Sequence, residues 1–157
     1  MRVLLKLVLD CDPLDAWQAL RDPKVFRQAS GPFTTVRSLE PGGFAQTWAP
    51  GEHRVAVSAL GIVPIGTQVI DLEMTERSGG IHVLRDSGHG ESGLLGMVTK
   101  WEHTMAVSSA GRGKTLYRDR LVIDVGPLTV FAWPMFWLFW QWRAARMRQL
   151  APTWGNK

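Results

Sequence analysis

The stretch 130-VFAWPMFWLFWQWRAARMRQL-150 decides the fold, because it is the only segment with the length and periodicity of a long helix. It places four of the eight tryptophans within ten residues and then turns basic. Its wholly apolar part, Val130 to Trp140, is too short for a bilayer span, which needs about 20 residues. The stretch therefore predicts a helix over residues 128–150, kinked near Pro134, that does not cross a membrane.

This helix is apolar on more than one side. One continuous stripe at i, i+3/i+4 spacing should face a sheet, and it consists of Phe131, Met135, Leu138, Trp142 and Ala145. The opposite side is also apolar, with Trp133, Phe136, Trp137 and Trp140. Burial under loops, a homodimer contact and a contact with a membrane surface each account for this second side.

The rest of the chain is mainly strand. Residues 2–10 alternate as a strand, and Asp12-Pro13 and Asp22-Pro23 then predict the N-termini of two short helices. Glycine and proline turns separate seven further strand candidates, which are 33–39, 43–49, 53–60, 67–76, 80–87, 98–109 and 113–125. Such short intervals favour an antiparallel meander. A sheet of this kind buries one face, and the C-terminal helix is the only element large enough to cover it.

Composition and charge narrow the class of protein. The length of 157 residues predicts a single domain, 1–157, and the single Cys11 fits a reducing cytoplasm. No spacing of cysteine and histidine indicates a metal, and no motif indicates a cofactor. Residues 1–124 are neutral in sum, so the net charge of +4 belongs to the C-terminal end. This distribution does not favour a nucleic-acid partner.

Parity indicates which polar side chains face the covered side of the sheet. In the last two strand candidates, 98–109 and 113–125, the residues with odd numbers point inward. They include Trp101, His103, Met105, Tyr117, Asp119 and Leu121. A turn centred near Gly111 sets His103 opposite Asp119. A register slipped by two sets Met105 opposite Asp119 and leaves His103 diagonal to it.

A buried His103–Asp119 pair has three alternative roles. It could lock two strands together, anchor the polar end of a ligand, or act as a general base. The carboxylate would favour the charged imidazole, whereas burial would oppose it. Tyr117 adds a third polar group on the same face.

The order of elements resembles the START-related helix-grip superfamily (SRPBCC), which includes polyketide cyclases/dehydrases and lipid-transport proteins. The resemblance spans the whole chain and has local support in "DPLDAWQALRDPKVFRQ", "GIVPIG", "WEHTMAV" and "TLYRDRLVIDVG". It implies an α+β fold in which a curved antiparallel sheet, with two short helices after the first strand, wraps around the C-terminal helix. It also implies a cavity between sheet and helix, but the fold hosts carriers, sensors and enzymes alike.

The resulting hypothesis is that an apolar or amphipathic small molecule binds in this cavity. His103, Asp119 and Tyr117 would form the polar end, and the walls would be Trp48, Val57, Leu72, Trp101, Met105, Leu121, Met135 and Leu138. One alternative is a cyclase- or aromatase-type enzyme in which His103 transfers protons. Another is a core filled by tryptophans, with no ligand and a homodimer or partner contact on the helix. No second acid–base group accompanies His103, which favours binding over catalysis.

Overall fold

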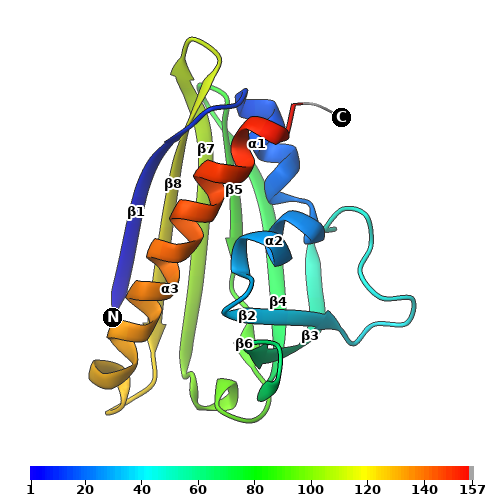
Figure 1. Cartoon of the computed structure of the whole chain (residues 1–157), viewed down its shortest axis with the longest axis vertical. Helices are drawn as coiled ribbons and strands as arrows, with labels where there is room; N and C mark the ends of the chain where they lie inside the picture. The colour runs from blue at the N-terminus through cyan, green and yellow to red at the C-terminus, as the bar shows by residue number, and fades with distance from the viewer. Residues whose placement is uncertain (156–157) are drawn as a thin grey trace.

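The computed structural model describes residues 1–155, in which one curved antiparallel sheet wraps around a long helix (Figure 1). The helices are α1 (Pro13–Leu20), α2 (Pro23–Ser30) and α3 (Thr129–Leu150), with short 3₁₀ turns η1 (Leu95–Met97) and η2 (Ala151–Thr153). The strands are β1 (Arg2–Leu9), β2 (Thr34–Ser38), β3 (Gly51–Ala59), β4 (Val63–Arg77), β5 (Ile81–Asp86), β6 (His89–Gly90), β7 (Lys100–Gly111) and β8 (Lys114–Asp124). The sheet order is β1-β8-β7-β5-β4-β3-β2, with β6 paired to β4. The predicted helix-grip fold class is confirmed.

The two short helices begin where the Asp-Pro pairs predicted. The side chain of Asp12 accepts a hydrogen bond from the backbone N–H of Leu14 at 2.9 Å, and that of Asp22 accepts one from Lys24 at 2.7 Å. These bonds satisfy backbone donors that a helix N-terminus leaves without partners. The long helix α3 begins at Thr129, one residue after the predicted start. Among the residues that the structure describes, no helix is both long and apolar enough to cross a bilayer.

The strand predicted over residues 43–49 is wrong, because this segment is a loop. Gly42 and Gly43 take positive φ angles of 87° and 81°, which turn the chain away from the sheet. The loop is then held by a hydrogen bond from the N–H of Trp48 to the carbonyl of Arg21, at 2.7 Å. The Trp48 ring packs against the rings of Phe26 and Phe44. Trp48 is therefore a core residue beside α2 and does not lie on a strand of the sheet.

The predicted inward stripe of α3 faces solvent instead. Phe131, Met135 and Leu138 are 78%, 74% and 60% exposed. The buried residues of α3 lie on another side of the helix and are Trp140, Arg143, Ala144 and Met147. The two sides are similarly apolar, so periodicity could not distinguish them. Hydrogen bonds from Trp140 and Arg143 to groups inside the fold select the inward side.

The β7–β8 hairpin has the slipped register, with Met105 opposite Asp119 and His103 opposite Leu121. The turn lies at Arg112 and Gly113, one residue beyond the centre that symmetric arms predicted, and both have positive φ. A register shift between Ser109 and Gly111 accompanies the turn. The parity prediction is unaffected, because a slip of two residues keeps every side chain on its face.

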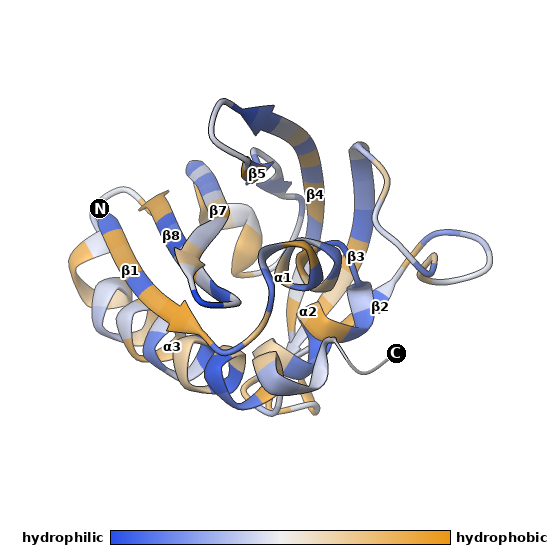
Figure 2. Ribbon diagram, turned by 90° about the horizontal axis from the view of Figure 1, so that it is seen from above, coloured by the Kyte–Doolittle hydropathy of each residue, from blue (hydrophilic) through white to orange (hydrophobic). Residues whose placement is uncertain are grey.

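The buried side chains form two apolar clusters along α3. The larger cluster joins the C-terminal half of α3 to α1, α2 and the sheet, and it includes Leu20, Val107 and Met147. The smaller one surrounds Trp140 and contains Leu121 and Ile123. Seen from above, the sheet curves around α3, and α1 and α2 lie near the C-terminal end of the helix (Figure 2). The first half of α3 thus has fewer neighbours than the second.

Candidate functional site

The candidate site lies on the face of the sheet that α3 covers. Directly opposed residues of neighbouring strands share a face, and one such row crosses the sheet through Leu72, Asp86, His103 and Leu121. Met105 and Asp119 face each other in the next row. His103 and Asp119 are therefore diagonal neighbours on β7 and β8. This diagonal is within reach of long and ring side chains.

Asp119 is the centre of a buried hydrogen-bond network. Its Oδ1 lies 2.9 Å from Nε2 of His103 and accepts a hydrogen bond from Nε1–H of Trp140, also at 2.9 Å. Its Oδ2 accepts a hydrogen bond from the hydroxyl of Tyr117 at 2.7 Å. An ionised carboxylate can only accept, so Nε2 of His103 carries a proton. The network joins two strands to α3 through a residue that is only 3% exposed.

Arg143 brings a second charge into the same interface. It projects from α3, is 5% exposed, and donates a hydrogen bond from Nη1 to the hydroxyl of Ser30 at 3.0 Å. Its guanidinium carbon lies 5.9 Å from the ring centre of Phe26 and 5.7 Å from that of Trp140. Its Nε is buried and has no hydrogen-bond partner in the structure. The charge of Arg143 therefore lies between aromatic rings with part of its donor capacity unused.

Charge and hydrogen bonding set the pKa of Asp119. Burial by itself would raise it, but the neighbouring charges of His103 and Arg143, with the hydrogen bonds from His103 and Trp140, lower the pKa to about 2. Asp119 is therefore ionised at neutral pH. Burial, and then the negative charge of Asp119, raise the pKa of Tyr117 well above its ordinary value, so the hydroxyl remains a hydrogen-bond donor.

A second buried carboxylate, Asp86, lies directly opposite His103 on β5. Its Oδ2 accepts a hydrogen bond from Nε1–H of Trp101 at 2.8 Å, and its Oδ1 accepts from the N–H groups of Asp71 and Gly88, both at 3.0 Å. Burial raises the pKa of Asp86 despite these donors. Asp86 is not among the predicted site residues, although its parity with Leu84 in the predicted strand 80–87 places it inward.

The structure brings most of the predicted site residues together but excludes three of them. The inward face of the sheet carries Leu72, Trp101, His103, Met105, Tyr117, Asp119 and Leu121. Trp48 lies in the loop beside α2, and Met135 and Leu138 point to solvent from α3. Trp140 and Arg143 take their place. The spacing of three residues places Trp140 and Arg143 on one face of α3. The sequence nevertheless favours a solvent-exposed Arg143, because a charge near a helix C-terminus is ordinarily solvated.

One end of the sheet–helix interface keeps aromatic side chains partly exposed. Trp101, Phe136 and Phe139 are half-buried and pack around Trp140, with Val98 beside them. The ring centre of Trp101 lies 6.4 Å from that of Phe136 and 6.2 Å from that of Trp140. An apolar, partly open surface therefore adjoins the buried His103–Asp119 network.

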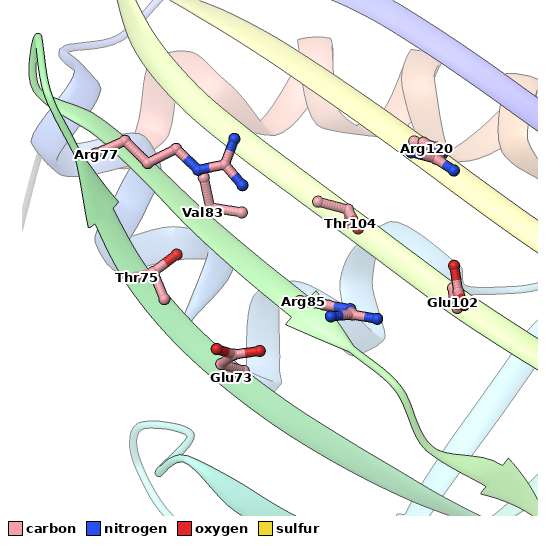
Figure 3. Close-up of a pocket in the computed structure, with 8 residues that line it drawn as sticks. All are labelled: Glu73, Thr75, Arg77, Val83, Arg85, Glu102, Thr104 and Arg120. Atoms are coloured by element: carbon pink, nitrogen blue, oxygen red, sulfur yellow. The ribbon is translucent and has the colours of Figure 1, made fainter.

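Two hollows occur elsewhere on the molecule. One, of about 550 Å³, lies on the solvent-facing side of the sheet, from which its charged and polar side chains project (Figure 3). It is lined by Glu73, Thr75, Arg77, Val83, Arg85, Glu102, Thr104 and Arg120. The other, of about 440 Å³, lies between α2 and the loop around Phe44. Neither hollow contains a residue of the His103–Asp119 network.

Comparisons with known proteins identify the fold. The hypothetical protein jhp0584 from Helicobacter pylori matches with a TM-score of 0.69 and 13% identity, over 96% of this chain and 88% of that one. Norcoclaurine synthase from Thalictrum flavum, as a point mutant with a transition-state analogue, matches with a TM-score of 0.65 and 14% identity, over 98% and 94%. Protein CV1439 from Chromobacterium violaceum gives 0.62 and 14%, over 96% and 97%.

No family model and no curated protein matches the sequence. At these identities the likeness shows the fold, which is the helix-grip fold predicted from the order of elements. The shared fold hosts at least one enzyme, norcoclaurine synthase, which has been seen with dopamine and hydroxybenzaldehyde bound.

Proposed function

We propose that this protein binds an apolar or amphipathic small molecule between the sheet and the first half of α3. The observation that carries the proposal is the half-buried aromatic group of Trp101, Phe136 and Phe139 beside a buried polar network. Small-molecule sites typically combine an apolar lining with a few converging polar groups. The reducing cytoplasm, suggested by the single Cys11, remains the proposed location.

The ligand's apolar part would contact Trp101 and Phe136, and its polar end would point toward His103. This direction follows from the order of groups along the interface, since the partly exposed rings lie at one end and Asp119 lies further inside. Asp86 and Asp119 flank His103 with two carboxylates. A hydroxyl or amine on the ligand would suit this surrounding better than a second anion, because a buried like charge is costly.

The network supports binding and leaves proton transfer as a second candidate. Nε2 of His103 is engaged by Asp119, and both oxygens of Asp119 already accept hydrogen bonds. A neutral His103 that donates from Nε2 keeps a lone pair on Nδ1, and a general base needs such a lone pair within reach of the proton that it removes. The proposal assigns His103 to orienting a ligand, and a cyclase-type reaction would use the same nitrogen.

The test is binding of N-phenyl-1-naphthylamine, a neutral apolar fluorophore, with its stoichiometry measured by native mass spectrometry. We expect one probe per chain for the wild type. Phe136→Ser should weaken binding by about tenfold, the equivalent of roughly 1.4 kcal/mol. Phe131→Ser is the matched control on the same helix, because Phe131 points to solvent, and it should bind like the wild type.

Val98→Phe gives a second variant that narrows the same space without removing an aromatic ring. It should also reduce probe binding while leaving the protein folded by circular dichroism. Probe binding that Phe131→Ser abolishes and Phe136→Ser preserves would place the site on the outside of α3 and contradict the proposal. A wild-type protein that takes up no probe would contradict it as well.

A further inference from the structure

The exposed stripe of α3 has the repeat of a helix–helix contact. Its members Phe131, Met135, Leu138, Trp142 and Ala145 are spaced four, three, four and three residues apart. This alternation is the heptad pattern in which apolar positions repeat every 3.5 residues and meet a partner helix. The three members in the N-terminal half are strongly exposed, and none of them is among the buried residues of α3. A second helix would complete this stripe.

The stripe carries no charge. Residues 126–142 contain no acidic or basic side chain, so the surface is compatible with a copy of itself. Two further exposed apolar side chains flank it, namely Leu128 and Val130, whereas Trp133 and Trp137 lie on the other side of the helix.

Charges at the two ends favour an antiparallel arrangement. Asp124 is exposed and precedes the N-terminus of α3, whereas Arg146 and Arg148 lie in the last turns of the helix. If a two-fold axis passes beside Met135, Phe131 of one copy meets Leu138 of the other. The carboxylate of Asp124 then lies level with the arginines of the second copy. A parallel arrangement would instead place like charges side by side.

We propose that a second copy of this chain packs on the exposed stripe, giving a two-fold symmetric dimer through antiparallel α3 helices. Phe136 and Trp140 stay on the inner side of the helix, so this contact is independent of the proposed ligand site. Trp142 already donates a hydrogen bond to the carbonyl of Gly31 and packs on Phe33. The apolar contact with the second copy therefore involves Phe131, Met135 and Leu138, and the charged ends lie beyond it.

The experiment exploits the symmetry at Met135, where each copy would meet the same residue of the other. The full-length wild type should have twice the 17.5 kDa chain mass by light scattering. Met135→Glu and Met135→Lys should each give monomers, because like charges meet at the axis. An equimolar mixture of the two variants should restore the dimer. Ile62→Glu is the control, since Ile62 is 80% exposed on the β3–β4 turn and should leave the mass unchanged.

A wild-type monomer would overturn the proposal. If that monomer also floats with phosphatidylglycerol vesicles, the occupant of the stripe is a membrane surface. A dimer that both charged variants preserve would place the contact elsewhere. A mixture that remains monomeric, although each variant is folded by circular dichroism, would overturn the two-fold axis at Met135.

Discussion

The two halves of α3 differ in a way that hydrophobicity does not explain. The N-terminal half, residues 129–139, has no charged side chain, and none of its residues is buried. The C-terminal half, residues 140–150, contains three arginines and all four buried residues of the helix, one of which is Arg143. The more apolar half is therefore the more exposed one.

The difference comes from what surrounds each half. The C-terminal half lies beside α2 and η2 (Figure 1). Arg143 in this half contacts Ser30 and Phe26 of α2. The N-terminal half lies on the sheet alone, so one side of it stays open. Burial of a helix face thus depends on neighbouring elements, whereas composition determines only what it costs to leave that face exposed. Exposed apolar surface of this size ordinarily marks a contact.

The largest expected effect comes from removing the negative charge of Asp119, which binds the C-terminal half of α3 through Trp140. Asp119→Asn replaces an acceptor oxygen with an amide donor, in a place where His103, Trp140 and Tyr117 all supply donors. It also leaves Arg143 without a nearby carboxylate. We expect a loss of about 3–5 kcal/mol in the free energy of unfolding, measured by urea denaturation. A loss below about 1 kcal/mol would show that the network does not hold α3 in place.

Acid should weaken the attachment of the C-terminal half of α3, because it protonates Asp119. The pKa of Asp119 is lowered to about 2 from an ordinary value near 4, so its stabilising effect is complete above about pH 4 and is lost as the pH falls to about 2. The expected contribution is about 2 kcal/mol. Asp86 acts in the opposite sense, because its raised pKa favours the fold as the carboxyl becomes protonated.

The acid effect is isolated by comparing the wild type with Asp119→Asn across this range. The wild type should lose about 2 kcal/mol of its advantage over the variant as the pH falls from about 4 to about 2. A difference between the two proteins that stays constant with pH would show that ionisation of Asp119 does not contribute.

A pair of tryptophans compares the two halves directly. Trp140→Phe keeps an aromatic ring but removes the N–H that donates to Asp119, and it should cost about 1–3 kcal/mol. Trp137→Phe, one turn earlier, should change the unfolding free energy by less than about 0.5 kcal/mol, because Trp137 is exposed. Equal losses at both positions in urea denaturation would contradict the distinction between the halves.

Much of the fold was predictable because it depends on local patterns. Asp12 and Asp22 begin helices through bonds to residues two positions away, and the bounds of α3 were predicted to within one residue. Parity alone predicted that His103 and Asp119 share a face. Parity allows two registers, and the diagonal contact belongs to one of them. The choice depends on a turn whose position is set by the positive φ of Arg112 and Gly113.

The rest required the tertiary structure. Trp48 is buried in a loop because α2 and Phe44 lie next to it, which no periodicity encodes. Arg143 is buried because Ser30, Phe26 and Asp119 converge on it from distant segments.

By itself, the sequence determined the order of elements, the strand faces and the presence of one long helix, since hydrophobic period and capping act over a few residues. Only the tertiary structure decided which side of α3 faces the sheet. The two sides are almost equally apolar, so the choice depended on hydrogen bonds between residues far apart in the chain. That choice places Trp140 and Arg143 inside and leaves Phe131, Met135 and Leu138 available to a partner.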